Sequence, residues 1–279
     1  MSGSAEYRPG SWGFFVRVML ARAYPRVAGL RRTPGWVVLE TALPVLSVSA
    51  FAFVYRAMHA PEEYLGIVIL GGAMTAFWLN VIWSMGAQFY WDREAGNLEL
   101  FLAAPCSLMA VLAGMALGGM VLTSVRAAAI VILGGLIFGV PFTPTSWWAL
   151  LATFLLLMLA LYGLGMVFAS VFLHWGRQAL HVISLLQEPV YVFSGLHFPV
   201  KVLGTALSSA AALLPLTAGV DALRQILFPR VAGQGLLPVW IEILLLAVLS
   251  VSFITLARFL LARMERVARR EGRLTVRWL

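Results

Sequence analysis

Residues 127–176 read AAAIVILGGLIFGVPFTPTSWWALLATFLLLMLALYGLGMVFASVFLHWG, and none of them is Asp, Glu, Lys or Arg. As one helix this stretch would be about 75 Å long, whereas the hydrocarbon core of a bilayer is roughly 30 Å thick. Pro141 and Pro144 interrupt it, because proline ends helices and biases the preceding residue toward extended geometry. The stretch therefore predicts most of one membrane-spanning helix and all of the next, joined by a short turn.

The composition of the whole chain supports a membrane protein. Of its 279 residues 61% are hydrophobic and 11% are charged. Soluble domains are about 45–50% apolar and about 25% charged, so this composition excludes a disordered chain and almost any soluble enzyme. The single cysteine, Cys106, excludes an intramolecular disulfide. The net charge is +8. In such an apolar chain the basic residues are expected to show which side of the bilayer each loop lies on, and no nucleic-acid partner is expected.

Applied along the chain, the length criterion predicts an all-α integral membrane protein with six transmembrane helices. The predicted spans are residues 37–55, 65–88, 108–138, 147–173, 179–200 and 237–261. They make up one transmembrane domain, residues 37–262. An N-terminal segment, 1–36, precedes this domain, and a basic tail, 263–279, follows it.

The arginines predict the orientation of the chain. With six spans and the N-terminus inside, the cytosolic side holds the six arginines of residues 1–36, Arg93, Arg177 and the seven C-terminal arginines. The external side holds only four basic residues: Arg56, Lys201, Arg224 and Arg230. A seventh crossing by residues 202–220 would place the C-terminal arginines outside, against the positive-inside rule. This uncharged stretch is therefore predicted as an external re-entrant segment, with both termini of the chain cytoplasmic.

The N-terminal segment is predicted to form an amphipathic helix that lies on the cytosolic membrane surface. Trp12, Phe15 and neighbouring apolar residues would contact lipid tails. Arg17, Arg22 and Arg26 would reach lipid head groups.

The cytosolic loop between the second and third spans has one apolar helical face. Leu98, Phe101, Leu102 and Pro105 recur at i, i+3, i+4 and i+7. Two interpretations fit this spacing: an ordinary connector that rests at the membrane interface, or a short helix that docks into a groove of another protein.

Arg126 and Glu188 are charged residues near the middle of predicted spans. A charge at a helix centre costs about 2.5–3.5 kcal/mol on insertion scales, so such residues pair with each other or face water. One interpretation is an intramembrane ion pair between Arg126 and Glu188. The other is that both residues line a water-filled pathway.

Polar side chains also form stripes on the second and fifth spans. Such stripes either hydrogen-bond helices together or line a polar route. The candidates for a translocation pathway are Asn80, Ser84, Gln88, Ser184, Gln187, Glu188 and Tyr191. A close-packing motif, Gly114-x-x-x-Gly118, is expected to serve packing within the chain. The sequence contains no H-E-x-x-H motif, nucleophile elbow or metal-ligand spacing of histidines, so neither a metal site nor an enzyme is expected.

Two motifs resemble the membrane permeases of type-2 ABC exporters. Residues 92–105, DREAGNLELFLAAP, resemble the family's cytosolic coupling motif, with Asn97 where a threonine is usual. The second motif comprises Ser194-Gly195-x-x-Phe198-Pro199, Leu214-Pro215-Leu216-Thr217 and Asp221-Ala222-Leu223-Arg224, and it resembles the family's external re-entrant region. The two motifs lie in the expected order and at the expected spacing.

The resemblance implies two six-span permease subunits, identical or paralogous, paired above two ABC ATPase subunits. The coupling motif would contact the ATPase through Arg93, Glu94, Gly96, Leu98, Glu99 and Phe101. The chain's only lysine, Lys201, follows Val200, so the phosphate-binding signature G-x-x-x-x-G-K-[ST] is absent from the sequence. ATP and Mg²⁺ are therefore expected on the partner, with no cofactor on this chain and no enzymatic activity of its own.

The resemblance implies export, and the apolar interior favours a hydrophobic drug-like or lipid-linked substrate. A glycan or lipid-linked glycan is the alternative, based on the aromatic residues of the second span: Phe77, Trp78, Trp83, Phe89 and Tyr90. A secondary transporter or channel is a further alternative, although an interrupted region occurs only after the fifth span. Nineteen arginines against one lysine indicate a GC-rich bacterial genome, so the expected location is a bacterial inner membrane.

Overall fold

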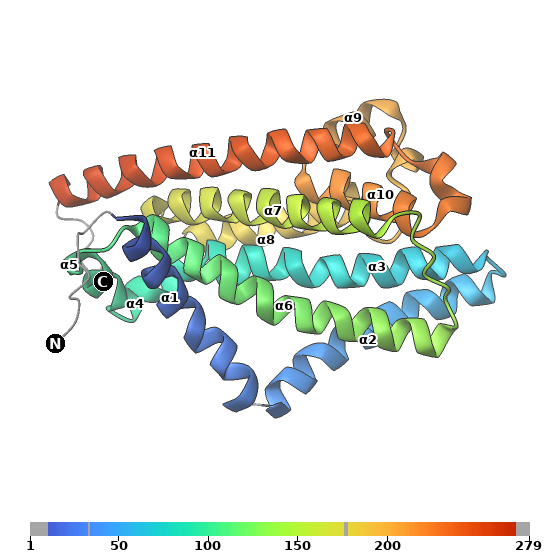
Figure 1. The fold of residues 1–279 in the computed structure, drawn as a ribbon, viewed down its shortest axis with the longest axis horizontal. Helices are drawn as coiled ribbons and strands as arrows, with labels where there is room; N and C mark the ends of the chain where they lie inside the picture. The colour runs from blue at the N-terminus through green and yellow to red at the C-terminus, as the bar shows by residue number, and fades with distance from the viewer. Residues whose placement is uncertain (1–10, 33, 176–177, 272–279) are drawn as a thin grey trace.

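The computed structural model describes residues 11–32, 34–175 and 178–271, and in these residues it contains helices and no β-strand (Figure 1). Five of the helices are long and apolar enough to cross a membrane: Val38–Ala57, Glu62–Glu94, Leu108–Phe138, Trp147–Val171 and Val239–Met264. The all-α, multi-pass fold that the sequence predicts is thereby confirmed. The count of six spans is not, because the fifth predicted span is a shorter helix.

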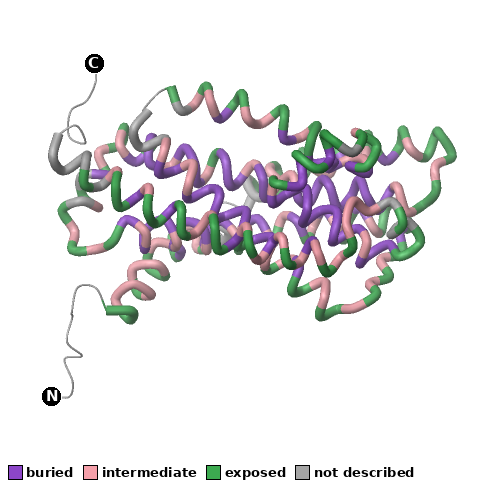
Figure 2. Tube along the Cα trace, turned by 90° about the horizontal axis from the view of Figure 1, so that it is seen from above, coloured by how far each residue is buried: buried purple, intermediate pink, exposed green. Residues whose placement is uncertain are grey.

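The long helices lie side by side in one elongated bundle (Figure 1). Helix α6 (Leu108–Phe138) packs on α3 (Glu62–Leu79), and α7 (Trp147–Trp175) packs along α11 (Val239–Glu271). Helix α2 (Pro34–Ala57) covers α3 and α6. Most residues of α3 are buried, whereas few residues of α2 and α11 are, as expected of helices that face lipid. Figure 2 shows the buried residues gathered along the middle of the bundle and the exposed ones on its outside.

The bundle has two ends that carry different short helices. One end, the α5 end, holds α4 (Gln88–Glu94), α5 (Asn97–Ala103) and the last turns of α11 (Figure 1). The other, the α10 end, holds α9 (Thr205–Ala211) and α10 (Pro215–Leu227). Helix α11 continues to Glu271, so the predicted basic tail begins as helix.

The second span is longer than predicted, because α3 continues through a π-helix into α4. The π-helix η1 (Asn80–Gly86) lies between the two α-helices, and the whole apolar run extends over Glu62–Glu94. Single π-helical turns inside helices often mark functional sites, because the extra residue redirects neighbouring side chains.

The predicted fifth span, residues 179–200, is longer than the helix that the structure shows there. Helix α8 (Gln178–Phe193) ends at Phe193, and its mainly apolar part, Leu180–Phe193, is about 21 Å long at 1.5 Å per residue. The helix cannot continue because Gly195 has a φ of +61°, which favours glycine. A Cβ at this position would also clash with Phe198 and Val200.

The predicted re-entrant segment, residues 202–220, is two helices rather than one. A 3₁₀ turn, η2 (Val200–Leu203), leads into α9, and a second 3₁₀ turn, η3 (Pro229–Gln234), follows α10. Pro215 starts α10, because a proline at the first helical position loses no helical hydrogen bond. Almost all residues of α10 are buried, against α7, α11 and α3.

The N-terminal helix packs against the bundle, in addition to any contact with the membrane surface. Helix α1 (Trp12–Arg32) packs along the first half of α6. Gly114 and Gly118 make this possible: a Cβ on Gly114 would meet the backbone oxygen of Met19, and one on Gly118 would lie 3.0 Å from the oxygen of Ala23. The two glycines thus serve packing within the chain, as expected.

Candidate functional site

The coupling motif lies on α4, α5 and the turn between them. Gly96 has a φ of +74° and allows the sharp change of direction from α4 to α5. Leu98 is 1% exposed and belongs to the hydrophobic core, and Phe101 packs partly buried against the same core. Leu100 on the opposite face is 67% exposed.

This geometry corrects the prediction that Leu98 and Phe101 dock into another protein. Both face their own bundle, because α5 folds back onto it. The outward surface of the motif instead carries Glu94, Asn97 and Leu100. Arg93 is half-buried, and the side chain of Glu99 lies outside the described ones.

Two arginines of α1 hold the coupling motif to the bundle. The guanidinium of Arg22 donates to Asp92 Oδ2 at 2.9 Å and lies 4.9 Å from the centre of the Phe101 ring. Arg26 donates to the backbone oxygens of Ser84 and Met115 and to Gln88 Oε1. The prediction that both arginines reach lipid head groups is therefore wrong, because α1 turns this face toward α4 and α6.

Gln88 joins these contacts into one network. Its amide nitrogen donates to Asp92 Oδ1 at 3.1 Å, and its amide oxygen accepts from Arg26. Burial lowers the pKa of Arg26, and the charge of Arg22 lowers it further. The three oxygens that accept from Arg26 and the negative charge of Asp92 favour its charged form. The network connects α1, η1, α4 and α6 at the α5 end.

The polar stripe of the second span faces protein. Asn80 is 6% exposed, and its Oδ1 accepts from the hydroxyl of Tyr162 on α7 at 3.0 Å. Gln88 bonds to Arg26 and Asp92, as above, and Ser84 is half-buried. Of the two interpretations for this stripe, hydrogen bonding between helices is the one that these contacts support.

The polar stripe of α8 behaves differently, because it stays largely on the surface. Ser184 and Glu188 are exposed, while Gln187 and Tyr191 are half-buried. The indole of Trp83 on η1 donates to Gln187 Oε1 at 2.8 Å, and the amide of Gln187 donates to Glu188 at 3.3 Å. An exposed carboxylate on an apolar helix of a membrane protein is favourable only where it faces water or contacts a polar partner.

The predicted ion pair between Arg126 and Glu188 is replaced by another pair. Arg126 pairs with Glu40 of α2. Helix α2 starts near the middle of the bundle rather than at its end (Figure 1). The contact between the two side chains shows that Glu40 lies at the depth of Arg126. Sequence reasoning did not pair Glu40 with Arg126, because residue 40 lies close to the start of the predicted first span, 37–55.

The second motif is held together by one buried arginine. Arg224 of α10 is 3% exposed and donates to the backbone oxygens of Gly195 and of Phe198, the latter at 3.0 Å. It thereby fixes the turn after α8 to α10. Beside it, the ring of His197 stacks on Phe51 at 4.5 Å, and burial and then the charge of Arg224 lower the pKa of His197.

A second part of this motif ties α10 to the start of α11. Asp221 Oδ2 accepts from the backbone nitrogen of Leu236 at 2.6 Å. Gln225 donates to Glu242 at 3.1 Å and to the backbone oxygen of Leu237. Within the part of the chain that the structure describes, no three His, Cys, Asp or Glu side chains are grouped as a metal site would require.

Comparison with known proteins assigns the family. No curated protein matches the chain. The family model for ABC-2 type transporters matches residues 16–228, which include the coupling motif, α8 and α10. The chain belongs to the ABC-2 type transporter family and is a multi-pass membrane permease component of an ABC transporter.

Proposed function

We propose that this permease exports a hydrophobic or lipid-linked substrate, and that it is driven by a separate ABC ATPase bound at the α5 end. The observation that carries the proposal is the division of the coupling motif into two faces. Its inner face is fixed to the bundle by Leu98 and by the Arg22–Asp92 pair, and its outer face presents Glu94, Asn97 and Leu100. A rigid helix with an exposed leucine can pass a displacement of the ATPase to the bundle.

The network around Arg26 supplies a route for that displacement. Asp92 precedes the coupling turn, and Gln88 and Ser84 lie one and two helical turns further along the same span. Since α1 contacts all three through Arg22 and Arg26, a movement of α5 would shift η1 and α1 together. This extends the coupling residues beyond the motif to Arg22, Arg26 and Gln88.

Two ATPase subunits and a second permease, either a copy or a paralogue, would complete the transporter. Helix α8 would make the sixth crossing, which would place both termini in the cytoplasm of a bacterial cell. The open polar face of α8, with Ser184, Gln187, Glu188 and Tyr191, would line the translocation pathway. ATP and Mg²⁺ would bind to the ATPase.

The buried aromatic residues favour a hydrophobic substrate over a glycan. Phe77, Trp78 and Phe89 are at most 1% exposed and Tyr90 is 8% exposed, so these four rings offer no open surface on which a sugar could stack. Of the five aromatic residues on which the glycan alternative is based, only Trp83 is exposed, and its indole nitrogen donates to Gln187. Sugars bind to exposed aromatic faces, whereas the exposed surface of the long helices is largely aliphatic.

The test uses inverted membrane vesicles that contain the permease and its co-expressed ATPase. We expect ATP added outside the vesicles to drive uptake of a fluorescent hydrophobic dye, which corresponds to export from the cell. The permease purified alone should hydrolyse no ATP.

A matched pair of variants tests the pathway within the same assay. Glu188→Ala should lower dye uptake while leaving the yield of the complex unchanged, because Glu188 is exposed on α8. Glu62→Ala removes an exposed carboxylate at the start of α3 and should leave uptake unchanged. Uptake that requires no ATP, or that is equal for both variants, would contradict the proposal.

A further inference from the structure

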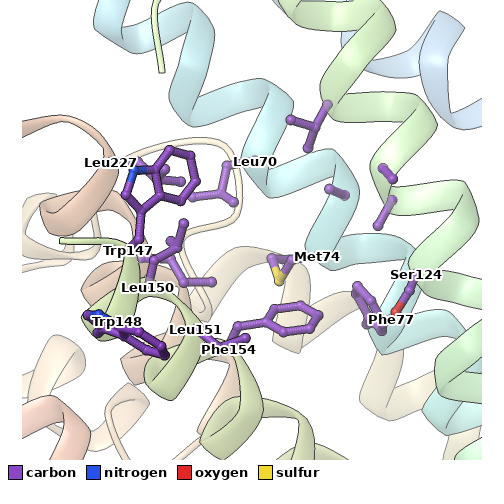
Figure 3. A pocket seen from close by; sticks show the side chains of 15 residues that line it. Leu70, Met74, Phe77, Ser124, Trp147, Trp148, Leu150, Leu151, Phe154 and Leu227 are labelled. Atoms are coloured by element: carbon purple, nitrogen blue, oxygen red, sulfur yellow. The ribbon is translucent and has the colours of Figure 1, made fainter. Parts of the chain in front are cut away.

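A deep groove lies between α6 and α7, on a side of the bundle away from α8 and the coupling motif (Figures 1 and 3). It has a volume of about 590 Å³. Residues of α6 and α7 form its walls, α3 forms its floor, and Leu223 and Leu227 of α10 close one end. The floor is protein core, since Leu70, Met74 and Phe77 are at most 5% exposed.

The lining of the groove is apolar. Among the described residues, Ser124 contributes the only hydroxyl that lines it, and no charged side chain lines it. Two alanines of α6, Ala127 and Ala128, leave the space open, because their side chains are small. A charged or strongly polar ligand would lose its hydration there without gaining partners.

Two tryptophans mark the depth of the groove relative to the bilayer. Trp147 and Trp148 lie at one end and are 72% and 82% exposed, and Figure 3 shows Phe77 and Ser124 at the other end. Both tryptophans begin α7, and tryptophan is enriched at membrane–water interfaces. The groove therefore starts at the interface and leads toward the middle of the membrane.

The length of the groove matches one leaflet. On α7 the lining extends from Trp147 to Phe154, and on α3 from Leu70 to Phe77. Each stretch advances seven residues, which is about 10.5 Å along a helix. One leaflet contributes roughly half of the 30 Å hydrocarbon core. The groove thus covers most of one leaflet without reaching the other.

We infer that this groove is a binding site for a hydrocarbon chain of a membrane phospholipid from the leaflet at the α10 end. The apolar lining, the interfacial tryptophans at the mouth and the length of one leaflet all fit such a chain. A helix of a second copy fits less well, because a helix with its side chains is about 10–12 Å wide and the floor lies behind both walls. The polar head group would remain beside Trp147 and Trp148.

The test reconstitutes the full chain in vesicles of phosphatidylcholine that contain a small fraction of the same lipid with a photoactivatable diazirine on its acyl chain. After irradiation, mass spectrometry locates the lipid adducts. We expect adducts concentrated on the groove residues of α6 and α7. They should exceed the adducts on other lipid-facing surfaces, such as α2 and α11.

Ala128→Phe fills the groove from an exposed position, and Ala152→Phe makes the same change at an exposed position of α7 that does not line it. The first variant should lower the groove adducts several-fold, and the second should leave them unchanged. Ala128→Leu repeats the test with a smaller side chain if the phenylalanine variant does not fold.

Adducts spread equally over all lipid-facing helices, or groove adducts that Ala128→Phe leaves unchanged, would overturn the inference. So would a disulfide-linked dimer formed by Ala128→Cys in a Cys106→Ser background without groove adducts. That result would assign the groove to a second copy of the chain.

Discussion

Arg22 of α1 and Asp92 of α4 are 70 residues apart in the sequence and 2.9 Å apart in space, between guanidinium nitrogen and carboxylate oxygen. Asp92 is 4% exposed and lies four residues before the glycine at which the chain turns into α5. The pair therefore fixes the N-terminal helix to the element that we propose to contact the ATPase. A second hydrogen bond, from the amide nitrogen of Gln88 to the other oxygen of Asp92, strengthens the same junction.

Removal of either partner should loosen this junction. Arg22→Ala leaves the carboxylate of Asp92 with one donor fewer, and we expect a loss of about 1–3 kcal/mol in stability, at the lower end because Arg22 is partly exposed. A double-mutant cycle with Asp92→Asn on apparent melting temperature measures the coupling. Strictly additive effects of the two changes would show that the pair does not stabilise the protein.

The packing of α1 on α6 can be tested at two glycines. Gly114→Ala should destabilise the protein by about 1–3 kcal/mol, because the new methyl group would overlap the backbone of α1. Gly29→Ala is the matched control, since a Cβ at Gly29 meets nothing within 4 Å. It should stabilise the helix by up to about 1 kcal/mol. Equal melting temperatures for both variants would contradict the close approach of α1 and α6.

The ion pair inside the bundle gives a third prediction. Arg126→Ala and Glu40→Ala should be coupled by more than about 0.5 kcal/mol in a double-mutant cycle, because the two side chains contact each other. Arg126→Ala combined with Glu188→Ala should give additive effects. Coupling of Arg126 to Glu188 instead of Glu40 would show that α2 and α6 pack differently.

His197 provides a prediction for acid conditions. Burial lowers its pKa in the folded protein, so the unfolded chain, with a histidine pKa of about 6.5, binds the proton more readily. The contribution of neutral His197 to the free energy of unfolding is complete above about pH 6.5. It should be lost as the pH falls through the pKa that His197 has in the folded protein. His197→Phe keeps the stacking on Phe51 and removes the proton site.

We expect the melting temperature of His197→Phe to fall less than that of the unchanged protein between about pH 7 and pH 5. Arg224 stays charged over this range, so its effect on both proteins is the same. Identical pH profiles for the two proteins would exclude His197 as a source of acid sensitivity.

The sequence predicted the membrane-spanning helices wherever the apolar runs exceeded the bilayer thickness. The helices around residues 127–176 are examples, since uncharged length and two prolines suffice to define them. The end of α8 was missed because no Asp, Glu, Lys or Arg occurs between Glu188 and Lys201, and only the backbone at Gly195 shows that the helix has ended.

The candidate site was predictable as a motif but not as a surface. The sequence spacing places Leu98 and Phe101 on one helical face, but it does not show whether that face contacts the helices of the same chain or a partner protein. The contacts of Arg22, Arg26 and Glu40 depend on where α1 and α2 lie along α6. That position depends on Gly114 and Gly118, whose spacing predicts close packing within the chain but does not identify α1 as the helix that packs there.

The most direct test of the account is the amount of ATPase that co-purifies with the permease. Leu100→Asp places a charge on the exposed face of α5, and a charge buried in an apolar contact without a partner is strongly unfavourable. Leu207→Asp makes the same change at an exposed position of α9, at the opposite end of the bundle. We predict that Leu100→Asp lowers the co-purified ATPase by about tenfold or more while Leu207→Asp leaves it unchanged. Equal recovery of ATPase with both folded variants would contradict the assignment of the α5 surface as the ATPase contact.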